Sequence, residues 1–137
     1  MAANLKPIFI KEGLNTTANT QIGNTIANAD GTDKKTVITG ATDGTLIYDI
    51  IAKSTDSVAR DITVYLHDGT TDWPLGVIPV GAEADSVSLL DTAYIPALNK
   101  RDDAAIILPS GYSLNVASDA AVTEATAITC VAYGGNY

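Results

Sequence analysis

The sequence predicts an all-β fold, an antiparallel β-sandwich or jelly roll of about eight strands, for three reasons. Short segments with apolar residues at alternate positions recur along the chain, and alternation is the period of a strand with one buried face. Gly, Pro and Asp-Gly turn signals separate these segments every eight to twelve residues or so. No stretch shows the apolar period of a long amphipathic helix.

The segment 106–116, IILPSGYSLNV, places strand and turn signals next to each other. Pro109 suits the second position of a tight turn, and Gly111 suits the position where the chain leaves it. We therefore expect two short strands joined at 109–111, and a related Pro-x-Gly element at 79–81. The alternating apolar residues of the two strands are Ile106, Leu108, Leu114 and Val116.

The other strands are predicted from residue type and alternation. Segment 45–53, TLIYDIIAK, is apolar on both faces, which is typical of a central, well-covered strand. In 61–67, DITVYLH, apolar residues alternate from Ile62 to Leu66, so one face meets the core and the other meets water or a partner. Further strands are expected at 36–39, 73–79, 87–90, 112–117 and 126–133.

Two kinds of connection join these strands. Asp-Gly tolerates the positive φ angles of tight turns, so each Asp-Gly pair predicts a turn. Segment 91–103 resembles neither strand nor simple turn and contains Pro96, so we expect a long crossover between two sheets. The Asp-Gly pairs lie at 30–31, 43–44 and 68–69.

A calcium site is the alternative explanation of the first Asp-Gly pair, because Asn28, Asp30 and Asp33 bring oxygen ligands together. The spacing fails the EF-hand pattern, in which Ile26 and Val37 would occupy the first and last ligand positions. Turn chemistry is the preferred interpretation, and we expect neither a bound metal nor a cofactor.

The chain has the length of one ordinary domain, 137 residues. We expect an extended N-terminal arm and polar loop over 1–24 and a single β-sandwich domain over 25–137. The segment KPIFIK, 6–11, is an edge strand of its own sheet or an arm on a neighbouring molecule, because a proline there donates no ladder hydrogen bond. The candidate partner contacts in this segment are Pro7, Ile8, Phe9 and Ile10.

Trp73 has two interpretations. It caps the edge of the core or stands on the surface as an anchor for a partner, and we favour the cap because a lone Trp in a chain of this size is usually needed for packing. As the anchor, Trp73 joins the candidate partner contacts. Three residues on, Gly76 is a predicted β-bulge.

Composition argues against several classes of function. A net charge of −8 disfavours binding to nucleic acid or to anionic membranes. The single cysteine, Cys130, cannot close an intrachain disulfide and lies in an apolar run, which predicts a buried, inert thiol. His67 has no motif-placed nucleophile and is expected to be a surface imidazole. Hydrolase, phosphate-loop and metalloprotease motifs are absent from the sequence, so we predict that the protein is not an enzyme.

Segments 105–116, AIILPSGYSLNV, and 127–137, AITCVAYGGNY, resemble small β-rich virion proteins of tailed bacteriophages, as does 61–70, DITVYLHDGT. In such proteins a strand of the "vtvyl.dg" kind precedes an "l.aG.sL.v" turn, and an aromatic-Gly-Gly-polar-Tyr tail ends the chain. The resemblance covers about half of the chain, within 45–137, and the KPIFIK segment matches nothing in it.

The resemblance implies a capsid decoration or cement protein. Such a protein binds the major capsid protein of the same particle as a symmetric homo-oligomer, such as a trimer. With no apolar run of signal-peptide or membrane-spanning length, we expect assembly in the host cytoplasm and a final position on the capsid surface of the virion. Two alternatives stay open: a receptor- or carbohydrate-binding module of a phage tail or adhesin, and another virion part such as a head-tail joining protein.

Overall fold

The structure is a computed structural model of the chain. It describes residues 12–13, 19–23, 34–91, 93–95, 106–123 and 125–137. The candidate contacts Pro7, Ile8, Phe9 and Ile10 lie outside the described residues, as do the oxygen-bearing residues Asn28, Asp30 and Asp33. Within the described residues the chain forms strands, turns and bends and no helix, which confirms the all-β prediction.

Ten strands occur in the described part of the chain. They are β1 (Glu12–Gly13), β2 (Asn19–Gly23), β3 (Lys35–Thr39), β4 (Thr45–Ser54), β5 (Arg60–His67), β6 (Asp72–Val80), β7 (Val87–Ser88), β8 (Ile106–Leu108), β9 (Ser113–Ser118) and β10 (Ala127–Asn136).

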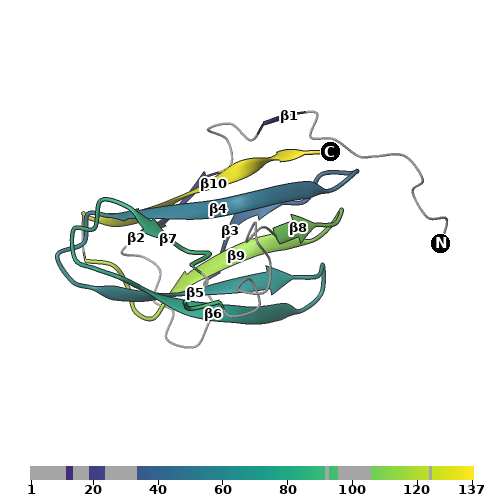
Figure 1. Cartoon of the computed structure of the whole chain (residues 1–137). Helices are drawn as coiled ribbons and strands as arrows, with labels where there is room; N and C mark the ends of the chain where they lie inside the picture. The colour runs from purple at the N-terminus through teal and green to yellow at the C-terminus, as the bar shows by residue number, and fades with distance from the viewer. Residues whose placement is uncertain (1–11, 14–18, 24–33, 92, 96–105, 124) are drawn as a thin grey trace.

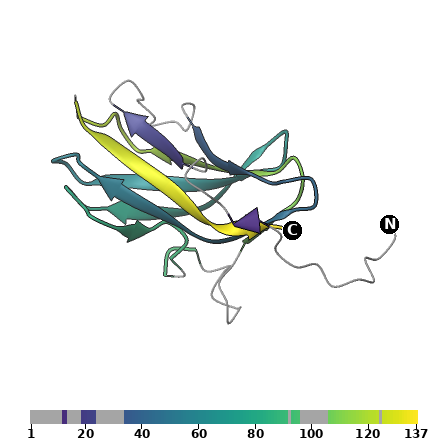
Figure 2. The ribbon, with the colours of Figure 1, turned by 90° about the horizontal axis from the view of Figure 1, so that it is seen from above.

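The strands form two antiparallel sheets that face each other (Figure 1). Sheet I has the order β1-β10-β4-β7, with β2 also paired to β10 and β8 also paired to β4. Figure 2 shows β10 running between β2 and β4. Sheet II has the order β3-β9-β5-β6. Each outer position of sheet I is therefore a broken strand, made of β1 and β2 on one side and of β7 and β8 on the other.

Counted with each broken strand as one, the sandwich has eight strands. In chain order these are β1/β2, β3, β4, β5, β6, β7/β8, β9 and β10. The first pairs with the eighth, the second with the seventh, the third with the sixth and the fourth with the fifth. This is the order produced when one long antiparallel ribbon wraps around a core, which is the jelly roll. Of the two predicted architectures, the jelly roll is therefore the one that describes the strand order.

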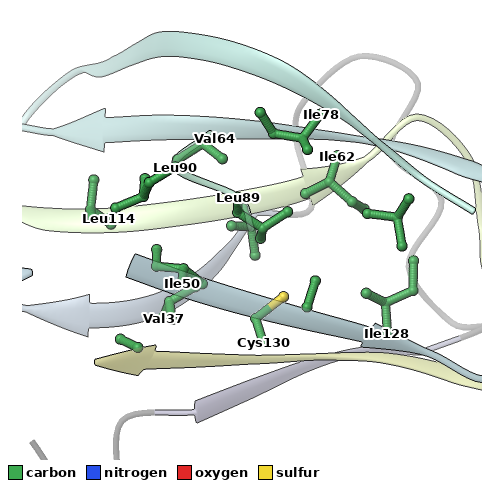
Figure 3. Close-up of a cluster of buried hydrophobic side chains, with 14 of the residues drawn as sticks. Val37, Ile50, Ile62, Val64, Ile78, Leu89, Leu90, Leu114, Ile128 and Cys130 are labelled. Carbon is green, nitrogen blue, oxygen red and sulfur yellow. The ribbon is translucent and has the colours of Figure 1, made fainter. Parts of the chain in front are cut away.

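The core lies between the sheets and is built from the inward positions of the long strands. In Figure 3, Ile62, Val64 and Ile78 of sheet II point toward Ile50 and Cys130 of sheet I. A fully buried Ile or Leu contributes about 1.5–3 kcal/mol relative to its exposed state. Burial of Ile62 and Val64 confirms the alternation predicted for this strand, and burial of Cys130 confirms the prediction for the thiol.

The predicted turn at 109–111 is present, but it is a corner between sheets and not a hairpin. Tyr112 N donates a 3.1 Å hydrogen bond to Pro109 O, and Gly111 has a φ of +82°. The flanking strands do not pair with each other, since β8 pairs with β4 of sheet I and β9 pairs with β3 and β5 of sheet II. The local pattern therefore predicted the turn, but each flanking strand pairs with strands that are distant in the sequence.

The β5–β6 connection is the hairpin predicted at Asp68-Gly69. Gly69 has a φ of +93°, and Asp68 N donates a 3.1 Å hydrogen bond to Thr71 O. The predicted bulge in β6 is also present, because Val64 pairs with Gly76 while its neighbour Tyr65 pairs with a residue two positions earlier. Pro79 does not start a turn, since it lies within β6, the edge strand of sheet II, where proline is tolerated.

The connection after β7 corrects the prediction of a crossover between two sheets. Its ends, β7 and β8, both pair with β4, so the chain returns to the sheet it left. Between them, the described residues Asp91 and 93–95 form a turn in which Asp91 O accepts hydrogen bonds from Tyr94 N and Ile95 N. Ile95 is buried and lies against Gly76 of β6. The described residues Tyr94 and Ile95 thus pack against β6 of sheet II, and Ile95 belongs to the core.

Candidate interaction surface

The outer face of sheet I carries apolar and aromatic side chains where a solvated sheet face is usually polar. Tyr48, Tyr133 and Ile107 are 53%, 54% and 50% exposed, respectively. Strand register places these side chains and three neighbouring apolar ones on the same face. Ile51 pairs with Val131 and Leu46 pairs with Ile107, and buried, inward-facing residues alternate with them along the strands. We call this patch the tyrosine face; its members are Leu46, Tyr48, Ile51, Ile107, Val131 and Tyr133.

A β-bulge at Tyr48 shapes the tyrosine face. Tyr133 pairs with Asp49 and Gly134 pairs with Ile47, so Tyr48 is an extra residue on β4. A Cβ on Gly134 would collide with the carbonyl oxygen of Leu46, because the bulge brings the two backbones together. Glycine at 134 therefore permits the bulge that leaves Tyr48 exposed near Tyr133.

A negative charge lies next to the tyrosine face. Asp49 lies beside Tyr133, and its Oδ1 accepts hydrogen bonds from Ser88 Oγ at 2.8 Å and from the backbone N of Ile50 at 2.7 Å. Lys53 lies toward the other end of β4, 3.8 Å from Asp85, and both of these side chains are exposed. The apolar face thus has a fixed carboxylate beside it.

A second group of exposed apolar residues follows the edge strand of sheet II. Trp73 and Val77 of β6 are 54% and 49% exposed, and Tyr94, whose carbonyl packs against Gly76, is 44% exposed. We call Trp73, Val77 and Tyr94 the β6 rim. The tyrosine face and the β6 rim lie on different sheets, so one molecule can use them for different contacts.

Trp73 stands on the surface, and the predicted cap over the core edge is wrong. Trp73 pairs with the core-facing Leu66. Because β6 is the edge strand, no neighbouring strand covers the Trp73 ring. The indole Nε1 donates a 2.9 Å hydrogen bond to Asp68 Oδ2, while Asp68 Oδ1 accepts from Thr70 N and Thr71 N. These bonds, the one from Trp73 first, lower the pKa of Asp68. The ring is therefore held in a defined orientation.

A polar cluster occupies the outer face of sheet II around Asp72. Asn115 Nδ2 donates to Asp72 Oδ1 at 3.0 Å, and Lys34 Nζ lies 3.2 Å from Asp72 Oδ2. Burial raises the pKa of Asp72, but Asn115 and Lys34 outweigh it and the pKa is lowered. His67 Nδ1 lies 3.2 Å from Asp72 Oδ1 without the geometry of a hydrogen bond. These groups mainly satisfy one another, which is typical of a structural cluster.

Asp56 is a fully buried carboxylate that the sequence analysis did not single out. Arg60 Nε donates to its Oδ2 at 2.9 Å, Val58 N donates to its Oδ1 at 3.0 Å, and Thr123 donates to it through both Oγ1 and N. Burial alone raises the pKa of Asp56, but the hydrogen bonds from Thr123, Arg60 and Val58 together hold it well below its usual range. Thr123 links the carboxylate to the β9–β10 loop, while Val58 and Arg60 hold it from its own side, so the group is structural.

The described residues hold no group of three or more His, Cys, Asp or Glu side chains that could bind a metal ion. Nor does that part of the chain contain a helix long and apolar enough to cross a membrane. In comparisons with protein-family models, curated proteins and solved structures, no match to this chain was found.

The sequence analysis identified one member of the two surfaces, Trp73, and missed the others. Tyr48 and Tyr133 were predicted within strands, but their exposure depends on the bulge that pairs β4 with β10. A signal was present in the Gly134-Gly135 pair, since glycine inside a strand often marks a bulge or a close backbone approach.

Proposed function

We propose that this protein is a non-enzymatic structural protein of a phage particle, which decorates and stabilises the assembled capsid by binding the major capsid protein. It acts as a symmetric homo-oligomer on the capsid surface of the virion, after assembly in the host cytoplasm. The proposal needs no cofactor, since decoration depends on contact area and shape complementarity.

The observation that carries the proposal is the pair of exposed apolar surfaces on opposite sheets, the tyrosine face and the β6 rim. A protein that both self-associates and binds a lattice needs two such surfaces, and aromatic residues are enriched in interfaces. The jelly roll is compatible with this role because it occurs in viral capsid domains, although it also occurs in lectins and in enzymes of the cupin type. The resemblance of 61–70, 105–116 and 127–137 to virion proteins adds support.

We assign the capsid contact to the β6 rim, because its Trp73 ring is pre-oriented by Asp68 and loses little side-chain freedom on binding. The test is co-sedimentation with empty heads of the phage that encodes the chain. Wild-type protein is expected to sediment with the heads, and a Trp73→Ala, Val77→Ser double variant is expected to stay in the supernatant.

The matched control for this experiment is Val58→Ser. Val58 is 47% exposed and lies in the β4–β5 loop, and it is not a member of either surface. The control is expected to sediment like the wild type. Absence of wild-type protein from the head pellet would contradict the proposal, and electron microscopy of particles with and without the protein would then distinguish decoration from a head-tail joining position.

Carbohydrate binding is a second candidate, favoured by the same Trp73 ring. An exposed aromatic ring held by a hydrogen bond can serve as a platform for a sugar, and jelly rolls occur in lectins. A glycan array with the wild-type protein, Trp73→Ala and Val77→Ser separates the candidates. A hit that Trp73→Ala abolishes and Val77→Ser leaves intact would favour sugar binding over capsid binding.

A further inference from the structure

Residues 1–11 differ in charge from the rest of the chain. They contain Lys6 and Lys11 and no Asp or Glu. Because the chain has 8 Lys and Arg and 16 Asp and Glu in total, residues 12–137 hold the other six basic residues and all sixteen acidic ones. The segment 6–11, KPIFIK, is thus an apolar stretch flanked by two positive charges in an otherwise strongly acidic protein.

The tyrosine face has the complementary character. Its exposed area is apolar, its members include no Lys or Arg, and Asp49 provides a carboxylate beside Tyr133. Asp43 lies in the turn that leads into β4, at the end of the face near Leu46. An extended peptide of about four apolar residues spans roughly 13 Å. That length matches the four residue steps of β10 from Val131 to Gly135, the five residues that cross the face.

The position of β1 indicates whether segment 6–11 reaches the tyrosine face of its own molecule or that of a second copy. Glu12 pairs with Asn136 and Gly13 with Gly135, antiparallel to β10. A strand that continued this register N-terminal to Glu12 would leave β10 at Asn136, at the end away from Tyr133. The register of β1 therefore favours the face of a second copy over the face of the same molecule.

We propose that segment 6–11 of one copy of this protein binds the tyrosine face of a second copy. Ile8, Phe9 and Ile10 supply the apolar contact with Tyr48 and Tyr133, and the flanking lysines face the acidic groups beside it. The contact is heterologous, so repetition around a rotation axis closes a ring in which every copy gives one segment and receives another. This inference rests on the homo-oligomeric part of the proposed function and names the contact that builds the oligomer.

The test uses the free full-length protein without heads, so its outcome is independent of capsid binding. Molar mass is measured by light scattering during size-exclusion chromatography for the wild type, Phe9→Asp, Tyr133→Asp and the control Val58→Asp. The wild type and the control are expected to elute as a closed oligomer, and both other variants as the 14.2 kDa monomer. Circular dichroism and thermal melts establish that each variant is folded.

Mixing the two monomeric variants is the decisive step. Phe9→Asp keeps an intact tyrosine face, and Tyr133→Asp keeps an intact segment, so the pair retains one functional contact and is expected to form a heterodimer. A monomeric wild type would overturn the proposal. An oligomer that Tyr133→Asp disrupts while Phe9→Asp leaves it intact would also overturn it, because the faces of two copies would then bind each other directly.

Discussion

Asp56 and Thr123 are 67 residues apart in the sequence, and the Thr123 hydroxyl donates a 2.6 Å hydrogen bond to the buried Asp56 Oδ1. The backbone N of Thr123 also donates to Asp56, at 3.2 Å from Oδ2. These two bonds tie the loop between β4 and β5 to the loop between β9 and β10. One buried carboxylate therefore joins two loops at this end of the sandwich.

Replacing Asp56 is expected to destabilise the protein strongly. Asp56→Ala leaves the largely buried Arg60 without its carboxylate and removes the acceptor of both Thr123 bonds, so the free energy of unfolding should fall by about 3–5 kcal/mol. Thr123→Val removes one donor and should cost about 1–3 kcal/mol. Urea unfolding measures both, with the exposed Asp61→Ala as control, for which a change within about 0.5 kcal/mol is expected. Equal stability of Asp56→Ala and Asp61→Ala would contradict the structural role.

Acid is expected to weaken the fold through the same carboxylate. The folded pKa of Asp56 lies below its usual value, so its contribution to stability is complete above the unfolded pKa of about 3.9 and is lost as pH falls toward the folded pKa. Asp72, whose pKa is also lowered, acts in the same direction. Unfolding free energies of wild type should therefore decline below about pH 5. The decline should be shallower in Asp56→Asn, and identical slopes in the two proteins would refute this assignment.

Gly134 is expected to tolerate no side chain. A Cβ at this position collides with Leu46 O, so Gly134→Ala should separate β10 from β4 locally and cost about 3 kcal/mol or more. Gly81→Ala is the matched control, because a Cβ there meets nothing within 4 Å, and a change within about 0.5 kcal/mol is expected. Chemical denaturation compares the two variants. Full stability of Gly134→Ala would mean that the bulge at Tyr48 is not needed by the fold.

The Cys130 thiol is expected to be unreactive while the protein is folded. Burial raises its pKa to about 12, so almost no thiolate is present near neutral pH, and the side chain lies within the core. A thiol reagent such as Ellman's reagent should label the native protein very slowly and the urea-unfolded protein completely. Rapid labelling under native conditions would show that β10 opens or that the thiol is accessible.

Asp68 is expected to control the motion of Trp73, which is the single tryptophan of the chain. Asp68→Ala removes the acceptor of the indole N–H and of Thr70 N and Thr71 N, so the ring should rotate more freely. Time-resolved fluorescence anisotropy of Trp73 should show a larger fast component in Asp68→Ala than in the wild type. Asp61→Ala serves as a control, and an unchanged decay in Asp68→Ala would contradict a held ring.

Strands and turns were predictable because their causes are local. Alternation from Ile62 to Leu66 and the Asp68-Gly69 pair each act within a few residues, and the structure contains both the strand and the hairpin. Burial of Cys130 followed in the same way from the apolar run around it. All of these features depend on residue type and on the geometry of neighbouring peptide units.

The choice of partner strand was not predictable in this way. Every strand offers the same N–H and C=O groups, so the sequence around Pro109–Gly111 indicates a turn but not that the two strands beside it join different sheets. Exposure of Trp73 depended on β6 becoming the edge of sheet II, and exposure of Tyr48 depended on a bulge opposite Gly134.

Residue order alone thus specifies the strands, the tight turns and the apolar character of the core, since each arises from interactions between near neighbours. The jelly-roll pairing, the two exposed apolar surfaces and the Asp56–Thr123 link appear only when segments many residues apart come together. They result from the joint burial of all strands around one core, a property of the whole chain that no single segment contains.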